Sequence, residues 1–292
     1  MSSSASSVPS PSAPVREEVL RAEAGWLDFP WHEIWAYREL VWLMVRREFQ
    51  AKYKQSILGP LWFLFQPVAT TVLFTVVFGR FGHLPTDGMP QSLFYMGGLV
   101  LWNYFIAVIG TTSNVLASNH NLFSKVYFPR LLVPISTAVS QTLQLLLNFV
   151  VFLCLYLFYS GWGHWIGSGW RGLLLMPVLV LYSGLFALGG GLLLSALTAK
   201  YRDVQYLISF VTQSLLYATP ILFPFSSVPH AWKVVVALNP MTWAVEAFKA
   251  SWFGLPMPPV WVAALGLVGV VVALFGGLLA FNRIEKSFVD TV

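Results

Sequence analysis

The chain has 292 residues, of which 57% are hydrophobic and only 10% are charged, with a net charge of +5. A soluble globular domain has about 25% charged residues, and the mean hydropathy here is +0.69. These values predict an integral membrane protein and exclude disordered, collagen-like and disulfide-rich secreted classes. The single cysteine, Cys154, permits no intrachain disulfide.

Residues 1–30 are predicted to form a flexible N-terminal tail. The first 15 residues contain seven Ser and three Pro and no apolar run, a composition typical of flexible segments. The segment also lacks the basic start and hydrophobic core of a signal peptide. We therefore expect the first apolar spans to act as uncleaved insertion signals.

Residues 31–54 have the pattern of an amphipathic helix at a membrane surface. Apolar Ile34, Tyr37, Val41 and Met44 recur at steps of three, four and three, while the charged residues fall largely elsewhere. Two interpretations remain open: the helix is a simple membrane anchor, or it also transmits force from a cytoplasmic partner.

Six charge-free windows predict the membrane spans of an all-α integral membrane fold. A helix needs about 20 residues to cross a hydrocarbon core of about 30 Å. The windows contain 25, 37, 40, 28, 29 and 33 residues, and all lie within residues 55–285. Six transmembrane helices are expected near 58–79, 93–117, 131–159, 173–197, 205–222 and 260–282, followed by a C-terminal cytoplasmic tail at 286–292.

The basic residues predict the orientation of these spans. With six spans, 13 of the 17 Lys and Arg residues fall on one side of the membrane, which the positive-inside rule assigns to the cytoplasm. Both termini are therefore expected in the cytoplasm. The basic charge is explained by topology and by anionic lipid headgroups, so a nucleic-acid partner is not expected.

Residues 220–245 are expected to form two short re-entrant helices in the outer leaflet. Four prolines interrupt this stretch, Pro220, Pro224, Pro229 and Pro240, yet it remains strongly apolar. Irregular backbone at membrane depth is tolerated only where protein or a water-filled cavity covers it. The segment is therefore expected to border a water-filled cavity or path.

The chemistry of an ATPase or a metalloenzyme is absent from the sequence. No G-x-x-x-x-G-K-[ST] motif occurs, and the five histidines form no H-E-x-x-H pattern. The predicted spans have no charged residues in their interiors, whereas ion relays usually need them. Glu246 and Lys249, three residues apart, are interpreted first as a local ion pair and second as a functional pair.

Small residues in two spans predict close helix packing. Gly189, Gly190 and Gly191 are consecutive, and Gly269, Ala273 and Gly277 recur at intervals of four. Such residues allow helix backbones to approach closely in membranes. The second set is expected to pack either within the chain or between two copies.

Six segments together resemble permeases of ABC-type polysaccharide exporters, and within them most closely the O-antigen exporter permeases of Gram-negative envelopes. Teichoic-acid and capsule export permeases are near relatives. The resemblance extends from about residue 31 to 285, and the segments occur in the right order. They are Arg38-Glu39-Leu40, RREFQAKYKQSILGPLWFLFQP (46–67), NLFSKVYFPR (121–130), AKYRDVQYLI (199–208), TPILFP (219–224) and LNPMTWAVEAFK (238–249).

The resemblance implies a half-channel that works as a homodimer above two separate ATP-binding subunits. Those subunits would hold ATP and magnesium, so no cofactor is expected in this chain. Residues 119–130 would be the coupling helix, with the alternative that they are merely a positively charged cytoplasmic loop. The residues expected to contact the ATPase are Phe123, Lys125, Tyr127, Phe128 and Arg130, and, from the amphipathic helix, Arg46, Arg47, Glu48 and Lys52.

A sliding glycan needs many weak contacts from aromatic rings and polar groups. Tyr206, Phe210, Gln213 and Tyr217 form one face of the fifth predicted span, and Trp62 and Gln66 lie on the first. We expect these six residues to line the channel, although such stripes also serve as helix packing or interface belts. Phe223, Phe225 and Trp232 are expected at an outer gate.

The function that the resemblance implies is export of a lipid-linked polysaccharide of O-antigen type across the bacterial inner membrane. Alternatives of the same architecture are export of teichoic acid, of capsule glycan or of a small hydrophobic drug. Alternatives of other classes are a membrane-embedded glycosyl- or acyltransferase, for which only Glu246 is a candidate acid, and a passive channel.

Overall fold

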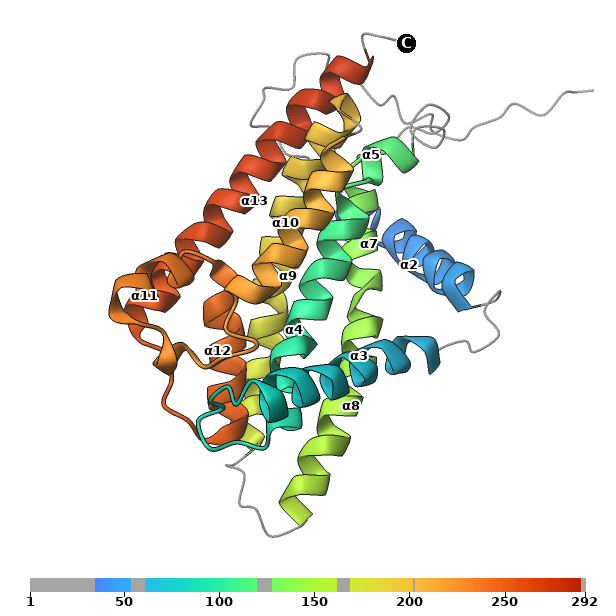
Figure 1. Cartoon of the computed structure of the whole chain (residues 1–292). Coiled ribbons are helices and arrows are strands. Elements are labelled where there is room, and N and C mark those ends of the chain that lie inside the picture. The colour runs from blue at the N-terminus through green and yellow to red at the C-terminus, as the bar shows by residue number, and fades with distance from the viewer. Residues whose placement is uncertain (1–34, 54–60, 120–127, 162–168, 202, 290–292) are drawn as a thin grey trace, which may run out of the picture.

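The computed structural model describes residues 35–53, 61–119, 128–161, 169–201 and 203–289, and Figure 1 shows their arrangement. Every regular element in these ranges is a helix, which confirms the all-α prediction for them. The elements are α2 (Arg38–Tyr53), α3 (Leu61–Phe74), η1 (Thr75–Phe81), α4 (Gln91–Thr112), α5 (Val115–Ser118), α7 (Leu132–Ser140), α8 (Thr142–Gly161), α9 (Trp170–Lys200), α10 (Val204–Ala218), η2 (Phe225–Ser227), α11 (His230–Ala237), α12 (Pro240–Phe253) and α13 (Val260–Val289).

Among the described residues, five helical stretches are long and apolar enough to cross a membrane. They are Leu64–Phe81, Gln91–Thr112, Leu132–Gly161, Trp170–Lys200 and Val260–Ile284. Each coincides with one of the six predicted spans. The remaining prediction, 205–222, corresponds to α10, which has 15 residues and is shorter than the usual span of about 20. Proline at position 220 explains the early end, because it cannot continue the helix.

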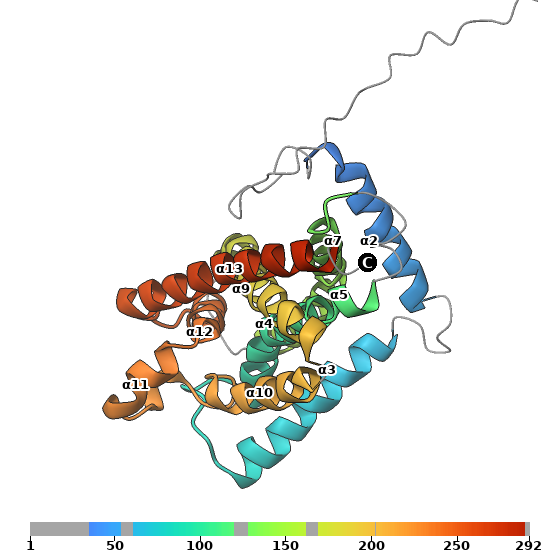
Figure 2. The same ribbon diagram turned by 90° about the horizontal axis from the view of Figure 1, so that it is seen from above.

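The core of the bundle is built around α4, which lies at its centre in the view from above (Figure 2). This helix is apolar all round, as expected of a buried helix, and its Phe94, Tyr95 and Trp102 are fully buried. Aromatic rings from α8 and α12 complete the cluster, with the Phe152 centroid 5.0 Å from that of Phe248. A tightly packed aromatic core therefore fixes α12 against α4 and α8.

The predicted small-residue contacts occur within the chain. A Cβ added to Gly277 on α13 would overlap the carbonyl oxygen of Gly189 on α9, and a Cβ on Gly191 would lie 2.6 Å from Cβ of Thr112. Gly269 faces the ring of Pro240. The within-chain interpretation of the glycine ladder is thus confirmed for Gly269 and Gly277, and the contact between Gly277 and Gly189 allows α9 and α13 to lie side by side.

The helices define two ends of the bundle. We call them the α5 end, which also contains the last turns of α9 and α13, and the α11 end, which contains the α3–α4 connection and the first turns of α9 and α13 (Figure 1). Hydrogen bonds from Thr198 Oγ1 to the Ser113 carbonyl, and from the Leu116 N–H to Ser195 Oγ, join α9 to the α5 region. Helix α13 continues to Val289, so residues 286–289 extend the last helix into the predicted tail.

Candidate functional site

Helix α12 carries two charged residues into the bundle at the α11 end. Its start is fixed by Asn239, whose side chain accepts a hydrogen bond from the Met241 N–H, and by Pro240 at the first helical position. The Tyr182 hydroxyl of α9 donates to the Pro240 carbonyl at 3.2 Å. At the other end Gly254, with φ of 70°, terminates the helix. These contacts hold Glu246 and Lys249 in a defined position.

Lys249 is a fully buried cation, with only 1% of its surface exposed. Its ammonium donates to the Pro220 carbonyl at 2.5 Å and lies 3.4 Å from Glu246 Oε1. It also sits 3.6 Å from the centroid of the Phe94 ring, where the face of the ring attracts a cation. A buried charge without partners is strongly unfavourable, and here a carbonyl, a carboxylate and an aromatic ring compensate it.

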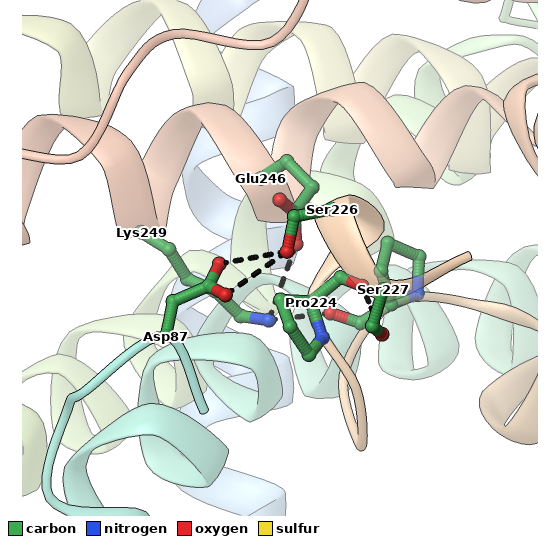
Figure 3. A network of polar contacts seen from close by, with 7 residues as sticks. Asp87, Pro224, Ser226, Ser227, Glu246 and Lys249 are labelled. Carbon is green, nitrogen blue, oxygen red and sulfur yellow. Dashed lines mark hydrogen bonds and ion pairs between the residues drawn. The ribbon is translucent and has the colours of Figure 1, made fainter. Parts of the chain in front are cut away.

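Two carboxylates extend this network toward the surface (Figure 3). Glu246 accepts a hydrogen bond from the Phe225 N–H. Asp87, in the α3–α4 connection, accepts the Ser226 hydroxyl, with Ser226 Oγ 2.9 and 3.1 Å from its two carboxylate oxygens. Asp87 and Gly88 have φ of 50° and 79°, so a tight turn presents the Asp87 carboxylate to the serine.

We call Asp87, Glu246 and Lys249 the charged clamp. Its members bind Ser226, Phe225 and Pro220 respectively, all within residues 220–226. The ion pair predicted between Glu246 and Lys249 is confirmed. The sequence did not predict the contact between Asp87 and Ser226. Asp87 and Gly88 form an Asp-Gly pair between two apolar spans, a pattern that predicts a tight turn but not the distant residue that the turn contacts.

The three residues predicted for an outer gate do not share one exposed surface. Phe225 is 6% exposed and packs with Val228, Ala237 and Val262, while Trp232 is 61% exposed. Phe223 is partly buried against the same cluster. Phe225 is therefore a core residue of the α10–α11 connection, because apolar neighbours from α11 and α13 surround its ring.

The predicted channel residues are found on the outside of the single chain. Tyr206, Phe210 and Tyr217 are 81%, 69% and 51% exposed on one face of α10, and Gln213 is exposed on the same face. On α3, Trp62 and Gln66 are also exposed. These residues share their exposure with Leu207 and Val211 of the same helix, and a path along them would require a second wall.

Helix α2 packs on α7 through the apolar face predicted from its periodicity. Tyr37, Val41 and Met44 contact a cluster that includes Phe128 and Leu132. Ser140 at the end of α7 donates a hydrogen bond to Glu48 Oε2 at 2.5 Å. In contrast, Arg46 and Arg47 are exposed. The basic side chains thus remain on the surface, whereas Glu48 is bound within the chain.

Phe128 was expected to fill a groove on the ATPase, but it is 6% exposed and is packed against Met44, Val115, Leu132 and Val133. This burial joins the end of the predicted coupling segment to α2. Arg130 is partly exposed. Phe123, Lys125 and Tyr127 lie outside the described residues, as does the Lys52 side chain.

Among the residues that the structure describes, no group of three His, Cys, Asp or Glu side chains could hold a metal ion. The polar groups identified instead bind backbone carbonyls, hydroxyls and N–H groups of the chain itself. The arrangement is that of a helical membrane protein in which charged side chains hold an irregular segment of backbone in place.

The chain belongs to the ABC-2 type transporter family, whose model matches residues 39–253. It is 29% identical over 263 residues to the "O-antigen export system permease protein RfbA" of Myxococcus xanthus, covering 89% of this chain and 98% of that protein. The protein of the same name from Klebsiella pneumoniae is 21% identical over 252 residues, covering 86% and 94%. The "Polysialic acid transport protein KpsM" of Escherichia coli is 23% identical over 252 residues, covering 84% and 93%.

Proposed function

We propose that this multi-pass membrane protein is the permease subunit of an ABC exporter that moves a lipid-linked polysaccharide of O-antigen type across the bacterial inner membrane. The observation that carries the proposal is the extent of the similarity. The family match covers α2 through α12, and relatives named for O-antigen and polysialic acid transport align with at least 84% of the chain.

The proposed topology has six crossings, with α10 as the short fifth span and both termini in the cytoplasm. The α5 end then faces the cytoplasm and the α11 end faces the periplasm. In support, the start of α12 contacts Tyr182 and Gly266, inside α9 and α13, whereas Trp252 near its end contacts Gly172 in the first turn of α9. Helices α11 and α12 would therefore enter the outer leaflet and leave it on the same side.

Energy would come from two separate ATP-binding subunits that hold ATP and magnesium. Residues 119–130 and the exposed Arg46 and Arg47 of α2 are the proposed docking surface. Phe128 and Glu48 link this surface to α7. A push on either contact would then move α2 and the third span together.

The glycan path is proposed to lie between two copies of the chain, along α10 and α3. Exposed amides at membrane depth are costly in contact with lipid. Gln213 and Gln66 are both exposed on the isolated chain, and so are the rings of Tyr206 and Phe210. A second copy would enclose these residues and leave a wet groove lined by rings and amides.

The test is genetic and chemical. Deletion of the gene should abolish the surface glycan and leave the lipid-linked precursor on the cytoplasmic side, and the wild-type chain should restore export. Loss of precursor synthesis when the gene is deleted would favour a transferase instead.

A further inference from the structure

We propose that the bond between Asp87 and Ser226 is a latch that ties the first span to residues 220–226, and that export requires this latch to open. Lys249 and Glu246 are positioning residues that hold the segment where Asp87 can bind it. The inference rests on the proposed export function, and it deepens that function by assigning roles to the charged clamp.

The segment between α10 and η2 has no regular structure, so its polar backbone groups need other partners. Pro220 and Pro224 have no N–H group, and the carbonyl of Pro220 accepts the buried Lys249 ammonium. The Phe225 N–H is bound by Glu246. Both contacts come from α12, so the segment is attached to α12 through its backbone.

Apolar contacts reinforce this attachment. Ile221 is fully buried, and a Cβ added to Gly98 of α4 would lie only 3.0 Å from its Cγ2. Phe225 packs with Ala237 of α11 and Val262 of α13. Movement of the segment away from α4, α12 and α13 would therefore remove the carbonyl acceptor of the buried Lys249 ammonium and open the core, both strongly unfavourable.

The hydrogen bond between Ser226 and Asp87 is exposed, unlike the buried contacts that hold the segment to α12. Asp87 and Ser226 are both exposed, and water can replace a hydrogen bond between exposed groups at little cost. Asp87 belongs to a connection that follows η1, a stretch of π-helix over Thr75–Phe81, and such irregular helix often marks a functional site. The exposed hydrogen bond between Asp87 and Ser226 is therefore weaker than the buried contacts of the segment with α12. We predict that the Asp87–Ser226 bond breaks while the segment remains attached to α12.

A reversible cross-link tests the latch. In a Cys154→Ser background, which removes the only cysteine, Asp87→Cys and Ser226→Cys are joined with a short bis-methanethiosulfonate reagent in the complex with the ATP-binding subunits. The matched control pair is Thr86→Cys with Met89→Cys, because these residues are hydrogen-bonded within the same turn. The control cross-link leaves the connection free of the 220–226 segment.

We expect cross-linking of the 87–226 pair to reduce glycan export at least tenfold and reductant to restore it, with little effect in the control pair. Undiminished export by the cross-linked 87–226 protein would overturn the latch. Failure of the Cys154→Ser parent to export glycan, with the ATPase present, would instead overturn the proposed function and the latch with it.

The positioning role has its own readout, the yield of the 87–226 cross-link. Lys249→Met should lower this yield several-fold at equal amounts of membrane-inserted protein, because the segment loses its attachment at Pro220. Lys249→Arg should restore the yield, since a guanidinium can still donate to the carbonyl. Equal yields in all three proteins would overturn the positioning role.

Discussion

The two ends of the bundle are held together by different forces. At the α11 end, a buried cation and two carboxylates bind the backbone and side chains of an irregular segment. At the α5 end, neutral hydrogen bonds join α9 to the α5 region, and α2 meets α7 through an apolar cluster around Met44 and Phe128, with the Glu48–Ser140 hydrogen bond at its edge. Apolar surfaces are non-directional, whereas charged contacts demand fixed geometry. The contact between α2 and α7 at the α5 end is therefore suited to relative movement of helices. The charged contacts at the α11 end are suited to a discrete open or closed state.

The largest effect is expected from Lys249→Met. The substitution leaves Glu246 without its buried cation and the Pro220 carbonyl without its donor, and breaking a buried pair in this way costs about 3–5 kcal/mol. Denaturant unfolding in detergent measures the loss. The partly buried Lys233 provides the control, since Lys233→Met removes only a ring contact at 5.8 Å and should cost less than about 1 kcal/mol. Equal losses would contradict the charged clamp.

Phe128→Ala tests the apolar contact between α2 and α7 at the α5 end, and we expect a slightly smaller loss of stability than in Lys249→Met. Its ring is buried against Met44 and Leu132, and truncation of a buried phenylalanine costs about 3 kcal/mol or more. Phe128→Leu should recover most of the stability. Unchanged stability in Phe128→Ala, accompanied by loss of ATPase binding, would show instead that the ring docks on the partner subunit.

An intermediate effect is expected from Gly277→Ala, which tests the close contact between α9 and α13. The new methyl would collide with the Gly189 carbonyl oxygen, and separating packed helices in this way costs about 1–3 kcal/mol. The neighbouring Gly276 has no atom within 4 Å of an added Cβ, so Gly276→Ala should be neutral or slightly stabilising. Thermal unfolding of both variants should show this contrast, and equal midpoints would contradict the α9–α13 packing.

The smallest effect is expected at the edge of the apolar end. A double-mutant cycle with Glu48→Ala and Ser140→Ala should give a coupling energy of about 1 kcal/mol, the usual net value for one hydrogen bond. The ratio of glycan exported to ATP hydrolysed should fall in both single variants, because α2 loses its polar attachment to α7. Additive changes in stability would show that this hydrogen bond does not couple the two helices.

Sequence reasoning was most reliable where a regular period applied. Steps of three and four on α2 identified Tyr37, Val41 and Met44 as the face that packs inward. Charge-free windows located the five long helices, and small residues at intervals of four marked the close contact at Gly277. These features follow from helix geometry and composition, so one sequence is enough to predict them.

The contacts that the sequence did not reveal join positions far apart in the chain. Asp87 and Ser226 are 139 residues apart, and no local pattern relates a turn to a distant serine. The burial of Phe225 and Phe128 was missed for a similar reason. An aromatic residue beside prolines has no period that tells which side faces the core, so its role depends on the helices packed around it.

The central proposal is that this chain forms the passage for the glycan and that separate ATP-binding subunits supply the energy. The most direct test is transport of a fluorescent lipid-linked glycan in proteoliposomes containing this chain alone, or this chain with its ATP-binding subunits. Accumulation against a gradient is expected only with both subunits and ATP present. Accumulation by this chain alone, without nucleotide, would contradict the claim.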